Sequence, residues 1–172
     1  MATPDFKATY RGSTTSLVAA ASANAFFVIM GSATKRIRVQ RFTISGGNLT
    51  VAENNAYVIK KISSAPTGGT ASAFPKTPSD ARNAAATVSL FQGYTAAPGL
   101  DGTLVGTLAS QRVVLPVATS VHDPVTFDFR ANGEAVPVTL NSTTEGVTIS
   151  FGAAPATAVT VNISAEFTEE DP

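Results

Sequence analysis

The 172-residue sequence contains no cysteine, no tryptophan and only one histidine, His122. Without cysteine, the chain can form no disulfide, thiolate zinc site or iron–sulfur cluster, and it has no cysteine nucleophile. One histidine cannot provide a metal site that needs several imidazole ligands. We therefore expect a protein that works without a cofactor.

Charge is also scarce. Twelve Lys and Arg residues balance 12 Asp and Glu residues, and 14% of the chain is charged, against about 25% in an average protein. A nucleic-acid partner would require a basic face, so none is expected. The most apolar run, LVAAASANAFFVIM (residues 17–30), is shorter than the roughly 20 residues that span a bilayer. We expect no membrane partner, no secretory signal and synthesis in a cytoplasm.

The residues present favour an all-β fold. Ala, Thr, Val, Ser and Gly predominate, and turn-forming glycines recur along the chain, a pattern typical of short strands in a sandwich or barrel. We predict a single jelly-roll-like β-sandwich domain over residues 17–172, with about 8–11 short antiparallel strands. The expected strands span residues 15–20, 25–30, 36–44, 56–63, 86–94, 103–109, 112–117, 125–129, 135–140, 146–151 and 159–167.

One expected strand changes face partway along. Ile37 and Val39 share one parity, whereas Phe42 and Ile44 share the other. A regular strand has a period of two, so the sequence predicts a bulge or twist near Gln40. The last strand, residues 159–167, alternates cleanly between apolar and polar residues, which predicts one buried face.

Two segments fall outside this pattern. Residues 1–16 are polar and turn-prone, and are expected to form an N-terminal arm that packs through Phe6 and Tyr10. Residues 65–85 are rich in Pro, Gly, Ser and Thr and are expected to form a long loop, which is uncommon unless it is functional. Phe74 in this loop either fixes the loop to its own sandwich or inserts into a neighbouring subunit.

Charges of opposite sign gather in two places. Acidic residues are concentrated at the C-terminal end, and basic residues follow the apolar run. These clusters either pair between copies of the chain or remain ordinary solvated groups. The acidic cluster consists of Glu166, Glu169, Glu170 and Asp171, and the basic cluster of Lys35, Arg36, Arg38 and Arg41, with Lys60 and Lys61 further on.

Candidate catalytic motifs are weak. His122 is followed by Asp123 and Pro124, which is typical of a turn entering a strand, and no G-x-S-x-G nucleophile motif or phosphate-binding glycine loop is present. The carboxylates sit mostly beside turn residues, without the aromatic platforms of a sugar cleft. A calcium site formed by Asp101 and neighbouring carbonyls stays open. We expect no enzymatic activity.

The order of the segments resembles a known group of proteins. It runs from SATKRIRVQRFTISG through YVIKKISSAPTGGT, FPKTPSDARNAAATVSLFQGYTAAP and GTLVGTLASQRVVLP to PVTFDF and EFTEE, over residues 13–170. This succession resembles jelly-roll virion proteins of tailed bacteriophages, most of all head decoration (cement) proteins. The resemblance implies a homotrimer on the capsid surface, bound to the major capsid protein. The expected contact residues are Phe6, Tyr10, Lys35, Arg36, Arg38, Arg41, Phe74, Glu169 and Glu170.

A second function fits the same fold. Jelly rolls are also common lectin scaffolds, so the alternative is a carbohydrate- or receptor-binding module attached to a phage head or tail, with a glycan as partner. Such a module would expose aromatic side chains on loops. Tyr94, beside Gly93, is the best candidate in this sequence.

Overall fold

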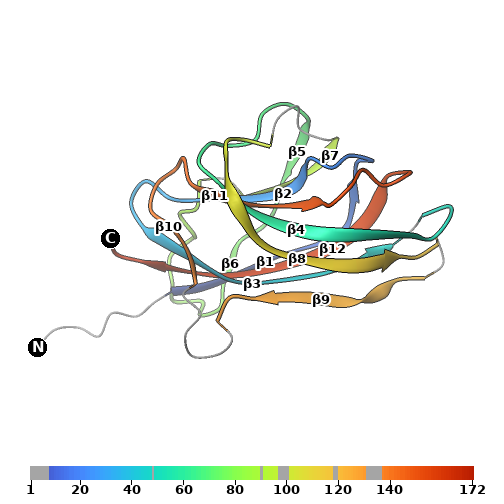
Figure 1. Cartoon of the computed structure of the whole chain (residues 1–172). Helices are drawn as coiled ribbons and strands as arrows, with labels where there is room; N and C mark the ends of the chain where they lie inside the picture. Colours follow the sequence, from blue (N-terminus) through green and yellow to red (C-terminus); the bar gives the residue numbers. More distant parts are fainter. Residues whose placement is uncertain (1–7, 48, 90, 97–100, 118–119, 131–136) are drawn as a thin grey trace, which may run out of the picture.

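A computed structural model describes residues 8–47, 49–89, 91–96, 101–117, 120–130 and 137–172. These residues form twelve β-strands in two antiparallel six-stranded sheets that face each other (Figure 1), which confirms the predicted β-sandwich. They contain no helix long and apolar enough to cross a membrane. The strands are β1 (Ala8–Ala19), β2 (Ala25–Met30), β3 (Arg36–Gly47), β4 (Glu53–Ile62), β5 (Thr70–Ala73), β6 (Thr77–Pro78), β7 (Phe91–Ala96), β8 (Leu104–Leu115), β9 (His122–Asp128), β10 (Val138–Leu140), β11 (Gly146–Phe151) and β12 (Val159–Glu170).

Eight of these strands have jelly-roll topology. The chain crosses repeatedly from one sheet to the other, so that β1-β12-β3-β9 in the first sheet faces β2-β11-β4-β8 in the second. This arrangement of two interleaved Greek keys defines a jelly roll. β10 pairs with the first part of β3, Ile37 to Val39, and β9 pairs with the later part, Arg41 to Gly46. The two strands therefore follow one another along the same edge of β3.

The remaining strands belong to an insertion between β4 and β8, residues 63–103. β7 and β5 extend the second sheet beyond β2, and β6 extends the first sheet beyond β1. The expected loop at residues 65–85 therefore contains two short strands. Sequence patterning missed them because they are short and have no buried face. Their extended conformation comes from pairing with β7 and β1.

The expected N-terminal arm is wrong over its described part. β1 pairs with β12 from Ala8 opposite Glu169 to Ala19 opposite Val159. Tyr10 is buried and stacks on Phe167 with ring centroids 5.4 Å apart. The glycine that made this segment resemble a turn, Gly12, serves packing instead, because the ring of Phe91 occupies the place of a Cβ there. Phe6 lies outside the described residues.

Other strand predictions can be compared directly with the structure. β2 and β11 have the predicted bounds. Arg41 pairs with Glu166 and Val39 with Phe167, which leaves Gln40 unpaired and confirms the predicted bulge. Two expected strands, residues 103–109 and 112–117, are one strand, because β8 pairs along the whole of β4. The expected turn at His122 is the start of β9.

Aromatic rings dominate the core between the sheets. Phe27 of β2 is almost fully buried and meets Phe42 of β3 edge to face, with centroids 6.0 Å apart. Phe91 of the insertion contacts Phe27 at 5.1 Å and Phe167 at 6.0 Å. The insertion therefore adds to the central core of the jelly roll.

Candidate interaction surfaces

The basic and acidic clusters lie side by side on β3 and β12. Arg38 Nε donates to Glu170 Oε2 at 2.9 Å, and Arg41 Nη2 donates to Glu166 Oε2 at 2.8 Å. At the end of the row, the Lys35 ammonium pairs with Asp171. We call this row the ionic seam: Lys35, Arg38 and Arg41 with Glu166, Glu170 and Asp171.

The ionic seam differs from both expectations raised by the sequence. The charges pair within one chain, because the antiparallel register of β3 and β12 places them on adjacent strands. Glu166 also accepts from Arg130 Nη1 at 3.3 Å, so its buried carboxylate has two cationic neighbours. Arg36 forms no ion pair with any residue that the structure describes. Because these charges already have partners in the chain, they offer little to a second copy.

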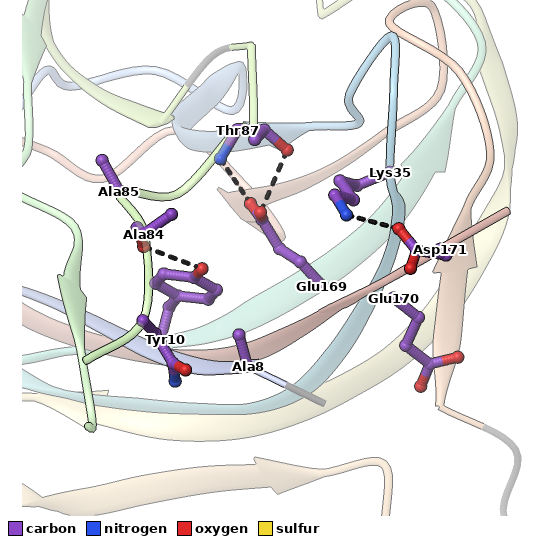
Figure 2. A pocket seen from close by; sticks show the side chains of 10 residues that line it. Ala8, Tyr10, Lys35, Ala84, Ala85, Thr87, Glu169, Glu170 and Asp171 are labelled. Atoms are coloured by element: carbon purple, nitrogen blue, oxygen red, sulfur yellow. Dashed lines mark hydrogen bonds and ion pairs between the residues drawn. The ribbon is translucent and has the colours of Figure 1, made fainter. Parts of the chain in front are cut away.

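Tyr10 and Glu169 hold the end of the insertion against the first sheet (Figure 2). Glu169 Oε1 accepts from the backbone N–H groups of Thr87 at 2.6 Å and Val88 at 3.1 Å, and its other oxygen accepts from Thr87 Oγ1 at 3.0 Å. The Tyr10 hydroxyl donates to the carbonyl of Ala84 at 3.0 Å. We call residues 84–88 the return segment, since they lead the insertion back to β7.

These contacts surround a shallow pocket. It joins four of the expected contact residues, Tyr10, Lys35, Glu169 and Glu170, in one place. Its volume is about 170 Å³, below the roughly 300 Å³ at which small-molecule sites begin. Because Glu169 is buried and uses both oxygens for the return segment, the site fixes the fold and leaves no room for a ligand of that size.

Phe74 packs on its own sandwich. Its ring stacks on Phe27 with centroids 5.7 Å apart and meets Phe91 edge to face at 6.1 Å. Gly93 of β7 makes room for it, since a Cβ there would overlap the ring. Of the two alternatives for Phe74, the structure therefore favours the fixed loop over insertion into a neighbouring subunit.

The single histidine connects the two sheets. His122 Nε2 lies 2.7 Å from the hydroxyl of Tyr57 on β4, and His122 Nδ1 lies 2.6 Å from the carbonyl oxygen of Asp123. Burial raises the pKa of Tyr57, so the phenol is neutral and can donate to the imidazole. With both ring nitrogens in these contacts, His122 has a structural explanation and forms no nucleophile–base pair in the described part of the chain.

Metal sites find no support in the described ranges, which contain no group of three or more His, Asp or Glu side chains able to hold an ion. Asp101, the candidate calcium ligand, uses one oxygen for the N–H of Ala25 at 2.5 Å and the other for Lys60 at 3.1 Å. Its carboxylate connects the segment before β8 to β2 and β4.

Aromatic side chains do not form a sugar platform. Tyr94 is only 3% exposed and packs with Val28, Met30 and Ile62 on the outer face of the second sheet. Every other described aromatic side chain is at least half-buried. The expectation that Tyr94 is an exposed loop aromatic is wrong, because it belongs to a strand that β2 and β5 flank.

Exposed aliphatic side chains gather in one region instead. Four lie along β8, and three lie on the connections between β3 and β4 and between β8 and β9, at the end of the sandwich where β8 stops. Those connections are joined where the N–H of Leu49 donates to the carbonyl of Pro116 at 3.1 Å. Among large apolar side chains in the described residues, only Val18 is exposed elsewhere. The β8 group is Leu104, Val105, Leu108 and Val114; the other group, called the valine tip, is Val51, Val117 and Val121.

Sequence reasoning missed this region because it weighted aromatics and charges. The available signal was the run LVGTLASQRVVLPV, residues 104–117, which carries one charge and no proline until its end. A comparison with protein-family models finds no family that matches this chain, and a comparison with curated proteins finds no similar protein.

Proposed function

We propose that this chain is a non-enzymatic structural protein of a tailed-bacteriophage virion. It binds the outside of the capsid and stabilises the contacts between capsomers. The jelly-roll topology supports this proposal, since such folds are common in viral capsid domains. Fold alone does not decide function, and the surface of the protein provides the second observation.

The valine tip carries the proposal. Val51 and Val121 are each 72% exposed and Val117 is 41% exposed. Apolar side chains grouped on an otherwise polar protein are typical of protein–protein contacts. The tip contains no charged residue, and it is built from two connections braced by Leu49 and Pro116. It suits an apolar depression on a capsid protein.

The mechanism would be mechanical. Burying a fully exposed valine contributes about 1.5–3 kcal/mol, so each of these partly exposed valines contributes less than that when the major capsid protein covers it, Val117 least of the three. A homotrimer placed where capsomers meet would repeat the contact around the shell, and symmetry would multiply a small interface many times. Separating capsomers would then require these contacts to break as well. The stiff β core and small net charge fit that role.

Heads of the encoding phage, prepared without this protein, provide the test. The wild-type chain should cosediment with them and raise the temperature at which they release DNA. The triple variant V51K/V117K/V121K should bind at least about tenfold more weakly, since three apolar contacts are lost. V18K is the matched control, because Val18 is an exposed valine on β1, and it should bind normally. Heads that show equal heat tolerance with and without the wild-type protein would overturn the proposal.

A further inference from the structure

The edges of the two sheets are protected unequally. The edge strands β5, β6 and β10 are only four, two and three residues long. β9 is longer but carries Asp123, Pro124 and Asp128, and charges and proline are the usual means of keeping a sheet edge from pairing with another chain. These four edge strands are therefore unsuited to further pairing.

β8 is the exception. It is twelve residues long, is the last strand of the second sheet, and has one charged residue, Arg112, and no proline (Figure 1). Two bulges disturb its first half, because Val105 and Leu108 have no partner on β4. From Ala109 to Leu115 the pairing with β4 is regular. Within the part of the chain that the structure describes, a regular stretch of seven residues, about 24 Å long, therefore has no strand paired along its outer edge.

We propose that residues 109–113 of β8, inside the regular stretch, pair with the same residues of a second copy of this chain, antiparallel and around a twofold axis. The two second sheets would then form one twelve-stranded sheet. An antiparallel strand is its own complement under twofold symmetry, so no second surface is required. The chain has zero net charge, and β8 carries no cluster of like charges that would repel the β8 of a second copy.

The side chains select one register. An axis through Arg112 would place two guanidinium groups opposite each other, which is destabilising. An axis through Val113 would place Ser110 opposite Pro116, which has no N–H to donate. An axis through Gln111 avoids both problems. It sets Ser110 opposite Arg112 and Ala109 opposite Val113, so that every paired residue lies inside the regular stretch.

The test uses a matched pair of variants at one exposed position. Ser110 is exposed on β8, so neither a lysine nor a glutamate should disturb the fold, and thermal unfolding of each variant checks this. In the proposed register, S110K places a cation opposite Arg112 twice per pair, which should weaken association about tenfold. S110E places an anion there and should retain or strengthen association. V18K serves as the control at a distant exposed site.

Sedimentation equilibrium of the purified full chain, without capsids, gives the mass of the particle. The wild type should contain an even number of chains, two or, if trimers form through another surface, six. At a concentration near the dissociation constant of the wild type, where about half of its chains are associated, S110K should have a clearly lower average mass, close to that of the unpaired species. A wild-type protein that stays a single chain at the highest soluble concentration overturns the inference, and so does a mass that is the same for S110K and S110E.

Cross-linking locates the contact independently. Because the chain has no cysteine, a single cysteine placed at Gln111 can bond only to its copy. Q111C should form a covalent dimer on mild oxidation. T126C, on the exposed face of β9, should remain monomeric under the same conditions. Equal yields from the two variants would contradict the pairing. Neither experiment contains a capsid. A negative result therefore counts against the pairing of β8 only, and the proposed capsid function is tested separately with phage heads.

Discussion

The two long sides of the sandwich are closed in different ways. On one side the insertion adds β5, β6 and β7, inserts Phe74 and Phe91 into the core, and is held by Glu169. On the other side β8 and β9 run next to each other (Figure 1), and the hydrogen bond between Tyr57 of β4 and His122 of β9 connects the two sheets. The conspicuous aromatics and the charges of the ionic seam stabilise the monomer, whereas plain aliphatic residues on the second side remain available to partners.

The largest expected effect comes from removing Phe91. Its ring is 4% exposed and contacts Phe27, Phe74 and Phe167, so it joins the insertion to both sheets. F91A should lower the free energy of unfolding by about 3–5 kcal/mol, the usual cost of such a cavity. Urea denaturation measures the change.

The matched change on the second side is V114A, because Val114 is 56% exposed. It should alter the free energy of unfolding by less than about 0.5 kcal/mol. If F91A cost no more than V114A, the insertion would be an accessory to the fold, and the contrast between the two sides would be lost.

A smaller effect is expected at the return segment. E169Q removes a charged acceptor that serves two backbone N–H groups and one hydroxyl. Hydrogen bonds to charged groups contribute about 1.5–3 kcal/mol, and we expect a loss in that range. Hydrogen exchange of the Thr87 and Val88 amides should accelerate more than exchange in β11. D123N, an exposed carboxylate change on β9, is the control and should leave those amides as protected as in the wild type.

The hydrogen bond between Tyr57 and His122, which connects the two sheets, should contribute less to the free energy of unfolding. Y57F deletes one neutral hydroxyl that donates to His122, and the imidazole is only half-buried, so water can replace the lost partner. The expected cost is about 0.5–1.5 kcal/mol, to be measured by urea denaturation beside E169Q. If Y57F lowered the free energy of unfolding more than E169Q does, the Tyr57–His122 hydrogen bond would stabilise the sandwich more than the contacts of Glu169 with the insertion.

Much of the fold could be read from local pattern, whereas the pairing of distant residues could not. β2 follows from a short, continuous apolar run, as expected of a strand buried on both faces. β11 follows from its alternating apolar residues, and the bulge at Gln40 follows from a change in which positions are apolar. The second half of β1 lies within the predicted strand at residues 15–20, whereas its first half, residues 8–14, was missed. That half contains Gly12, which is typical of a turn but here makes room for the ring of Phe91. The partnership of Arg38 with Glu170 depends on a register between residues 132 positions apart, and no local signal encodes it.

The candidate surface was hidden for a related reason. A strand's position in the sheet decides whether its aliphatic residues are core or surface, and sequence pattern does not give that position. β8 and β11 both read as apolar strands, yet β11 lies between two neighbours and is fully buried, while β8 is last in the sheet. Only the topology separates a core strand from a docking edge.

The smallest predicted effect compares the two sides through pH. On β9, hydrogen bonds from Arg130 lower the pKa of Asp128, and in the insertion Arg82 lowers the pKa of Asp80 in the same way. A folded-state pKa below the unfolded value, about 3.9, contributes stability above that value and loses it as pH falls through the folded pKa. D128N should therefore be less stable than wild type near pH 7, by under about 1 kcal/mol for so exposed a pair.

Urea denaturation at about pH 7 and about pH 2.5 tests this, and the gap between wild type and D128N should close in acid. D80N should show the same direction, since both aspartates bond the arginine two residues on. Asp128, unlike Asp80, also has Arg41 of the ionic seam nearby, which lowers its pKa further. Added salt should therefore reduce the stability difference between wild type and D128N more than the difference between wild type and D80N, since screening weakens the more distant charge first. A stability difference that grew in acid would contradict the direction of both pKa shifts.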